Sequence, residues 1–203
     1  ALNGIRADEM GLGKTLQSIS LLGYLTCELK VKHPHLIVVP LSVLGNWQRE
    51  LSHWCPSLRV LRLHGDKDER GRLIQEELVM GLFDVVLTTY ETIASEQTAL
   101  RKLRWTALVV DEAHRLKNEK ARLSVVCRGM KAERRILLTG TPIQNNLHEL
   151  WALLNFLYPE IFTSSEPFDD AFDAKMGAVV QSALEQLQRL LQQCMLRRLK
   201  TEV

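Results

Sequence analysis

The sequence lacks several features that would assign it to a specialised class of protein. Its four cysteines stand far apart, with no CxxC pair and no histidine at metal-ligand spacing, so we expect neither a zinc site nor a disulfide framework. No apolar run approaches the roughly 20 residues that a membrane-spanning helix needs, and no charged-then-apolar leader opens the chain. These absences favour a soluble protein of a reduced intracellular compartment that has no membrane partner.

The chain also has little net charge. A formal charge of +2 is too small for a uniformly basic surface, so any contact with nucleic acid must come from local clusters that the fold brings together. With 203 residues, of which 46% are hydrophobic, the chain is long enough to bury one substantial core. We therefore expect one compact domain.

Short apolar segments rich in β-branched residues recur along the chain. Between most of them lie stretches with helical periodicity. The candidate strands span residues 4–7, 36–40, 59–63, 84–89, 106–111 and 135–140. Strand-helix-strand alternation predicts an α/β fold with a parallel sheet and helices on both faces. Because the first candidate strand contains Arg6, which would need a partner or an exit to solvent, we expect that strand near an exposed edge.

The pattern changes to helix only after residue 146. The segment LHELWALLNFLYP and an amphipathic stretch over about 178–200 both have helical periodicity. We therefore expect residues 1–146 to form the sheet core and residues 147–203 to form a C-terminal helical appendage.

Nearly every candidate strand ends in a polar or glycine-rich cluster, and in open parallel sheets ligands bind beyond the carboxyl ends of the strands. After the first strand, Gly11, Gly13, Lys14 and Thr15 open a helix. Glycines let backbone amides turn toward phosphate oxygens, Lys14 would reach the β and γ phosphates, and Thr15 would offer a hydroxyl to magnesium. Since Asp8 replaces the first glycine of the usual phosphate-loop pattern, a simple helix-capping turn is the alternative.

A second motif, Asp111 and Glu112, comes directly after the apolar run LVV. Two adjacent carboxylates at the end of a buried strand are costly unless a cation or a hydrogen-bond network compensates them. Asp111 would hold magnesium, and Glu112 would orient and deprotonate an attacking water. An exposed strand-to-loop turn is the alternative. If the interpretation is right, Lys14 and Asp111 converge at one rim of the sheet.

Three segments together resemble the superfamily-two helicase fold in its Swi/Snf branch: DEMGLGKT at 8–15, VVDEAHRLKN at 109–118 and LLTGTPIQNNLHELWALLNFL at 137–157. LRRLKTEV at 196–203 is similar to the segment that closes the first RecA-like lobe in that family. The segments GDKDER, KNEKARLS and SSEPFDDAFD are most similar to those of the imitation-switch remodellers, with the Chd type next. The resemblance implies a RecA-like, P-loop ATPase lobe.

The resemblance carries functional residues over position by position. The implied nucleotide site comprises Asp8, Met10, Gly11, Leu12, Gly13, Lys14, Thr15 and Leu16, with Lys14, Asp111 and Glu112 as catalytic residues and Thr15 and Asp111 on magnesium. Residues implied to couple this site to DNA are His114, Thr139, Gly140, Thr141 and Gln144, with Pro142 and Asn145 in the same motif. A turn with local hydroxyl bonds is the alternative for that motif.

The family's DNA contacts come from strand-end loops of this lobe. They map here onto Pro40, Ser42, Trp47, Gly65, Asp66, Lys67, Thr88, Thr89, Tyr90, Lys117 and Asn118. Small hydroxyls, loop amides and lysines suit gripping of phosphates without reading bases. Each has an alternative: Trp47 has the spacing of a core residue with Trp54, Lys67 fits a solvated helix face with Arg70, and Lys117 and Asn118 could simply begin a helix.

The resemblance implies an ATP- and magnesium-dependent DNA translocase of the nucleus that remodels nucleosomes and works on duplex DNA. The second RecA-like lobe, with its arginine finger, lies outside this sequence, so we expect the isolated chain to be nearly inactive. The rival interpretations are a nucleotide-dependent DNA- or partner-binding module without catalysis and a DNA repair translocase of the same superfamily.

Overall fold

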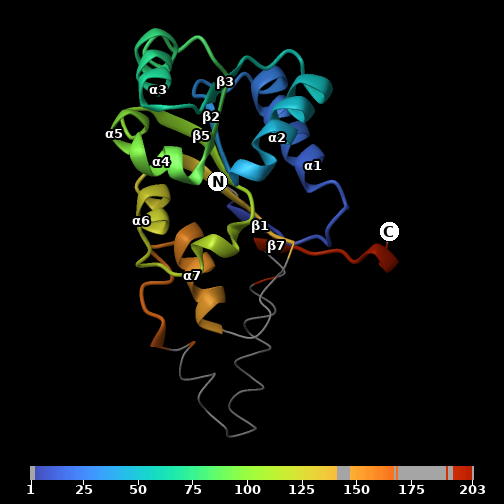
Figure 1. Ribbon diagram of the computed structural model, residues 1–203. Coiled ribbons are helices and arrows are strands. Elements are labelled where there is room, and N and C mark those ends of the chain that lie inside the picture. The colour runs from blue at the N-terminus through green and yellow to red at the C-terminus, as the bar shows by residue number, and fades with distance from the viewer. Residues whose placement is uncertain (1–2, 141–146, 167, 169–190, 192–193, 203) are drawn as a thin grey trace, which may run out of the picture.

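The computed structural model describes residues 3–140, 147–166, 168, 191 and 194–202. In this part of the chain, seven parallel strands form one sheet in the order β3-β4-β2-β5-β6-β1-β7 (Figure 1). The strands are β1 Gly4–Arg6, β2 His35–Val39, β3 Val60–Leu63, β4 Val85–Thr89, β5 Arg104–Val110, β6 Lys131–Leu138 and β7 Met195–Leu196. The six strands predicted from the sequence are confirmed, although β6 begins four residues earlier than expected.

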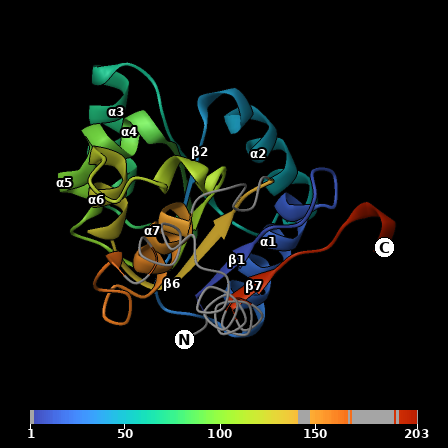
Figure 2. The same ribbon diagram turned by 90° about the horizontal axis from the view of Figure 1, so that it is seen from below.

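Helices cover both faces of the sheet (Figures 1 and 2). They are α1 Lys14–Gly23, α2 Leu41–Trp54, α3 Lys67–Leu73, α4 Tyr90–Ser95, α5 Gln97–Leu100, α6 Arg122–Arg128 and α7 Leu147–Leu157. Short helical turns at Tyr24–Glu28 and Ile74–Leu78 extend α1 and α3, and two more lie at Ala113–Leu116 and Lys200–Glu202. The predicted α/β class, with helices on both faces, is confirmed.

Successive residues of each strand point to opposite faces and so build two separate cores. On one face, Ile37 and Val39 of β2 pack in a cluster with residues of α1 and α2. On the other face, Leu36 and Val38 belong to a cluster that includes residues of α3 through α7. Each β2 residue of these two pairs is fully buried, which agrees with the continuous apolar run of a central parallel strand.

The C-terminal part of the chain differs from the sequence prediction. Met195 and Leu196 form strand β7, which pairs in parallel with β1, so the expectation of helix to about residue 200 is wrong there. Strand β1 therefore has a neighbour on each side, β6 and β7. It lies one strand from the edge formed by the two-residue β7, in agreement with the expected position near an exposed edge, and Arg6 is half-buried. Of the rest of that stretch, residues 178–190 and 192–193 lie outside the described residues.

Helix α7 is an integral part of the sheet's packing. Its residues Leu153, Phe156 and Leu157 belong to the same apolar cluster as β2 and β5. Among the described residues, no helix is long and apolar enough to span a membrane. None of the four cysteines forms a disulfide in the part of the chain that the structure describes.

Candidate functional site

The loop between β1 and α1 has the backbone geometry that a phosphate-binding turn requires. Gly11 and Gly13 have φ values of 92° and 72°, in the left-handed region that side chains with a Cβ rarely adopt. Gly13 also occupies the N-cap of α1, so the free amides of the first turn point out of the helix toward the loop. The Lys14 Nζ donates to the carbonyls of Asp8 at 2.7 Å and Glu9 at 3.3 Å.

The phosphate-loop candidates and the paired acids line one cavity of about 330 Å³. Lys14 and Thr15 contribute from the start of α1, while Asp111 and Glu112 contribute from the end of β5. The full lining is Met10, Gly11, Gly13, Lys14, Thr15, Leu16, Asn46, Glu50, Asp111, Glu112 and Gly140. The convergence of Lys14 and Asp111 that the sequence predicted is therefore present, while the chemical roles of these residues stay predictions.

Three hydrogen bonds to its oxygen atoms hold Asp111 in place. Its Oδ2 accepts a 2.8 Å hydrogen bond from the Trp47 indole, and its Oδ1 accepts one of 2.9 Å from the Glu112 amide. The Tyr90 hydroxyl donates to the Asp111 carbonyl. Burial raises the pKa of Asp111 above its usual value, against the opposing effect of the Trp47 hydrogen bond. A positive group or a cation in the cavity would favour the ionised form of this carboxylate.

Glu112 sits in an unusual backbone conformation. Its φ is 51°, a left-handed geometry that is uncommon for residues other than glycine and that clusters at functional sites. Its Oε2 lies 3.3 Å from Nδ1 of His114. The carboxylate therefore has an imidazole neighbour within 3.3 Å.

Thr139 and Gly140, the described part of the motif that follows β6, pack against β1 and the loop between β1 and α1. Thr139 is buried, and its amide donates to the Arg6 carbonyl at 3.0 Å. Gly140 leaves room for the loop, because a Cβ there would lie 2.9 Å from Met10 Cγ and 4.0 Å from Lys14 Nζ. The candidates Thr141, Pro142, Gln144 and Asn145 lie outside the described residues.

Asp8 and Leu12 do not line the cavity, although the resemblance carried both into the nucleotide site. Asp8 is fully buried, and its carboxylate is bonded to Arg198 and Gln17. Direct contact between the Asp8 side chain and a ligand therefore does not fit the structure. Asp8 instead stabilises the loop between β1 and α1 through hydrogen bonds made outside the cavity.

Asn46 and Glu50 of α2 line the cavity and were missed by the sequence interpretation. Their spacing of four residues, on one face of a helix that begins at a strand-end loop, is the signal that could have found them. Glu50 also accepts a 2.6 Å hydrogen bond from the Trp54 indole. The strands alone did not indicate that α2 reaches this site.

Four of the candidate DNA contacts have buried side chains. Trp47, Thr88, Thr89 and Tyr90 are 1%, 0%, 1% and 4% exposed. Thr88 Oγ1 donates to the Leu63 carbonyl, and Thr89 Oγ1 accepts from the Thr92 amide at the start of α4. The prediction of direct side-chain contacts with DNA at these four positions is therefore corrected, because their side chains are used in packing and in holding strand-end loops.

The remaining candidates stay accessible. Pro40 and Gly65 are half-buried, and the exposed residues are Ser42, Asp66, Lys67, Lys117 and Asn118. Lys117 forms a 2.9 Å ion pair with Glu149 of α7, and the Asn118 Oδ1 accepts from the Lys120 amide.

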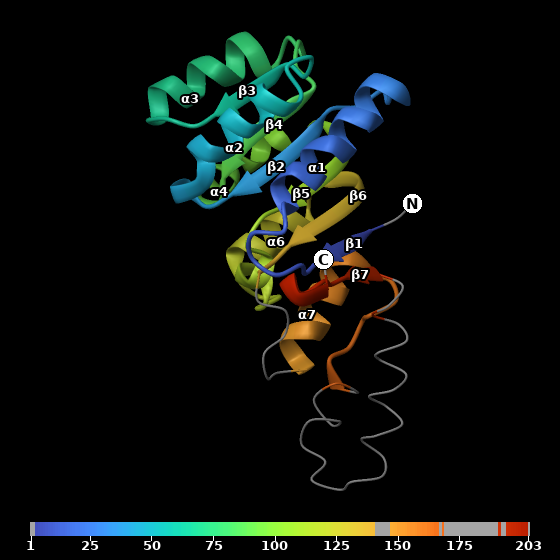
Figure 3. The same cartoon turned by 90° about the vertical axis from the view of Figure 1, so that its right-hand side faces the viewer.

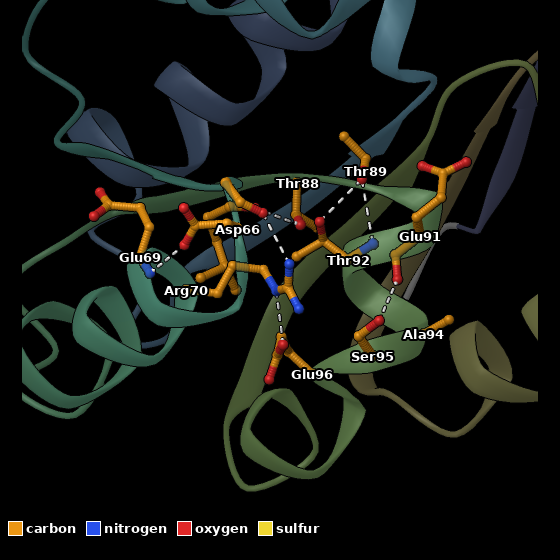
Figure 4. Close-up of polar contacts among 12 residues, drawn as sticks. Asp66, Glu69, Arg70, Thr88, Thr89, Glu91, Thr92, Ala94, Ser95 and Glu96 are labelled. Carbon is orange, nitrogen blue, oxygen red and sulfur yellow. Dashed lines mark hydrogen bonds and ion pairs between the residues drawn. The ribbon is translucent and has the colours of Figure 1, made fainter.

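The loop after β3 is braced by Arg70, as Figure 4 shows. The Arg70 guanidinium donates to the Gly65 carbonyl and to Glu96, both at 2.8 Å. Asp66 caps α3 by accepting from the Glu69 amide at 2.9 Å. Lys67, the first residue of that helix, is therefore held at a defined position beyond the end of β3.

Comparisons with known proteins agree with this geometry. A family model described as SNF2-related domain matches residues 1–203. A human SWI/SNF-related matrix-associated actin-dependent regulator of chromatin, subfamily A member 1, is 52% identical to the chain over 202 residues, which is 100% of the chain and 19% of that protein. The ISWI chromatin-remodeling complex ATPase ISW2 of Saccharomyces cerevisiae is 50% identical over 203 residues, covering 100% of the chain and 18% of its own length.

A solved structure described as a Sulfolobus solfataricus SWI2/SNF2 ATPase core in complex with dsDNA superposes with a TM-score of 0.82 at 34% identity. The match covers 98% of the chain and 41% of that structure. The chain thus spans about a fifth of the length of the curated relatives named above. The resemblance read from three sequence motifs is confirmed over the whole chain, which belongs to the SNF2-related domain family.

Proposed function

We propose that the chain is the nucleotide-binding lobe of an ATP-driven motor that moves along duplex DNA and remodels nucleosomes when joined to a second lobe. The observation that carries the proposal is the shared cavity, which Lys14, Thr15, Asp111 and Glu112 all line. A lysine in a glycine turn at a helix N-terminus binds phosphate, and paired acids at the end of a neighbouring strand suit a magnesium-assisted transfer to water.

The residues present fit a magnesium-bound triphosphate. Asp111 is a carboxylate whose burial raises its pKa, so a nearby divalent cation would favour its ionised form. Thr15 also lines the cavity, and its hydroxyl is a further oxygen ligand that a magnesium ion would accept. Bound magnesium would neutralise charge on the phosphate oxygens. The chain itself orients the carboxylate through Trp47 and the Glu112 amide.

Glu112 is the residue proposed to orient the attacking water and accept its proton. It lines the cavity together with Asp111, where its carboxylate would accept the proton of a water bound in the cavity. His114, 3.3 Å from the Glu112 carboxylate, is placed to couple this residue to the neighbouring loop. Thr139 and Gly140 connect the same region to β1 and the phosphate loop.

Duplex DNA is the proposed track. The accessible strand-end residues, above all Lys67 and the backbone amides near Gly65 and Ser42, suit phosphate contacts that carry no sequence information. The archaeal structural relative is described in complex with dsDNA, and the yeast relative is described as a chromatin-remodeling complex ATPase. These relatives support nucleosomes as the substrate and the nucleus as the location of the whole protein.

The rival function is a nucleotide-dependent clamp that binds DNA or a partner without hydrolysis. A DNA repair translocase of the same superfamily would share the site but would gain nothing from histones. The two alternatives differ in measurable ways, because a clamp has no turnover and a repair translocase responds equally to naked DNA and to nucleosomes.

The test is ATP turnover by the full-length protein alone, with naked duplex and with nucleosomes. We expect stimulation by DNA and further stimulation by nucleosomes. Glu112→Gln should retain ATP binding and lose turnover by at least about a hundredfold, the lower range for removing a general base. Full turnover in Glu112→Gln would contradict the role of this residue, and equal stimulation by DNA and nucleosomes would favour a repair translocase.

A further inference from the structure

An ion pair between a buried carboxylate, Asp8, and a partly exposed arginine, Arg198, joins the two ends of the described chain at the phosphate loop. The Asp8 carboxylate is 0% exposed, and Arg198 donates to it from Nη2 at 2.5 Å, from Nε at 3.3 Å and from its backbone amide at 3.0 Å. A buried carboxylate is costly unless it is paired and hydrogen-bonded. The Arg198 hydrogen bond holds the pKa of Asp8 below its ordinary value, although burial acts in the opposite direction.

The segment around Arg198 runs alongside the loop rather than touching it at one point. The Ala7 amide donates to the Leu196 carbonyl at 2.8 Å, and the Glu9 amide donates to the Arg198 carbonyl at 3.0 Å. The Lys200 amide in turn donates to the Glu9 carboxylate at 2.8 Å. Pairing between β1 and β7 therefore continues past the strands into the loop, as Figure 3 shows for the C-terminal segment in red beside the loop after β1 in blue.

Asp8 is also hydrogen-bonded to Lys14, whose side chain lines the cavity. Its carbonyl accepts the 2.7 Å hydrogen bond from Lys14 Nζ. Its carboxylate accepts a 3.3 Å hydrogen bond from Gln17, whose amide also donates to the Leu12 carbonyl at 2.8 Å. Gln17 lies one turn into α1, so Asp8 connects Arg198 with the lysine, the apex of the loop and the first turn of the helix.

We propose that Arg198 is a positioning residue of the nucleotide site, which fixes the phosphate loop and Lys14 through Asp8. This inference rests on the proposed function. The inference goes beyond that function, because Arg198 does not line the cavity and lies 190 residues from Asp8 in the sequence. Arg198 acts on the binding of triphosphate rather than on the chemical step, since its contacts reach Lys14 and the loop but not the acids at the end of β5.

Arg197, the neighbour of Arg198 in the sequence, provides a matched control. Arg197 is exposed, and it makes no hydrogen bond or ion pair among the residues that the structure describes. Arg197→Ala therefore removes the same charge from the same segment without touching Asp8. Arg198→Lys keeps the charge but replaces the planar fork with a single ammonium group.

The experiment measures the KM for ATP, kcat and thermal midpoint of the full-length protein with saturating duplex DNA. Arg198→Ala should raise the KM by roughly 10- to 100-fold, by analogy with the loss of a hydrogen-bonded partner behind a metal-binding side chain. Its kcat at saturating ATP should stay within about threefold of the wild-type value. Arg198→Lys should give an intermediate KM, and Arg197→Ala should leave the KM unchanged.

A second pair of measurements links the effect to Asp8. In a double-mutant cycle, Asp8→Asn combined with Arg198→Ala should raise the KM no further than either change alone, because both remove the same interaction. Fully additive effects would contradict the proposed route through Asp8. If Arg198→Ala does not fold, Arg198→Lys decides the question with the same readouts, and an unchanged KM overturns the proposal.

Three other outcomes overturn it as well: a KM in Arg198→Ala within twofold of the wild type, an equal rise in Arg197→Ala, or a fall in kcat and thermal midpoint with the KM unchanged. The last result would mean that the ion pair only stabilises the fold. Failure of the proposed function itself looks different, because the unsubstituted protein would then show no ATP binding and no turnover.

Discussion

The indole of Trp47 on α2 donates a 2.8 Å hydrogen bond to Asp111 at the end of β5. This contact joins two residues 64 positions apart and makes a core side chain part of the candidate site. Trp47 is 1% exposed and packs in the apolar cluster of α1 and α2. Its position explains how a carboxylate whose burial opposes ionisation is kept in a fixed orientation.

Trp47→Phe should reduce ATP turnover about tenfold or more while the fold persists. Phenylalanine fills most of the same volume but donates no hydrogen bond, and loss of a hydrogen bond to a charged group costs roughly 1.5–3 kcal/mol. Initial rates at saturating ATP and magnesium measure the effect.

Trp105→Phe is the matched control. Trp105 is also fully buried, and its indole donates to the Leu100 carbonyl at 3.2 Å, away from the cavity. Both changes should lower the thermal midpoint, but only Trp47→Phe should slow turnover. Equal loss of turnover in the two variants would show that Trp47 matters only for packing.

The stability of the chain should rise with pH between about pH 4 and pH 6.5 because of His35. Burial lowers the pKa of His35 from 6.5 to about 4, an effect that Asp84 opposes and Arg134 reinforces. In this window the unfolded state binds the proton and the folded state does not, so the free energy of unfolding increases with pH and levels off above pH 6.5. A shift of this size corresponds to at most about 3 kcal/mol.

Urea unfolding at pH 4.5, 5.5 and 7.5 measures the slope of the free energy of unfolding against pH. His35→Gln, which cannot titrate, should flatten it, while His53→Gln at an exposed position should not. An unchanged slope in His35→Gln would assign the pH dependence to other groups.

Lys67→Ala should weaken binding to duplex DNA by a similar factor for all sequences and should reduce the salt dependence of binding by about one phosphate contact. Lys67 is exposed at the start of α3, beyond the carboxyl end of β3. Affinity for unrelated duplexes across a salt series measures both effects.

The control is Lys102→Ala, an exposed lysine just before β5 and so at the opposite edge of the sheet. It should leave DNA affinity unchanged. A similar loss in both variants would indicate a general charge effect rather than a contact at the strand-end loop.

The central strands and the convergence of the two main motifs could be predicted because their signals are local. β2, β4 and β5 are almost entirely buried and rich in aliphatic and β-branched residues, and parallel strands bring the loops at their carboxyl ends to one edge of the sheet. Lys14 directly follows one such loop, and Asp111 begins another. Their proximity could therefore be predicted without knowledge of side-chain packing.

The features that were missed depend on partners far away in the sequence. Met195 and Leu196 become a strand only because β1 offers an open edge, and their local helical periodicity indicated otherwise. The side chains of Thr88 and Thr89 are hydrogen-bonded to the Leu63 carbonyl and the Thr92 amide instead of being exposed to DNA. Residue type alone does not reveal these contacts. The pairing of Asp8 with Arg198 is likewise invisible to local patterns.

The most direct test of the shared triphosphate site is ATP binding by the full-length protein with and without magnesium, measured for the wild type, Lys14→Ala and Asp111→Asn. We predict magnesium-dependent binding in the wild type, loss of binding in Lys14→Ala, and binding in Asp111→Asn that no longer responds to magnesium. Equal, magnesium-dependent binding in all three proteins would contradict this site, because the lysine and the acid could not then hold the same triphosphate.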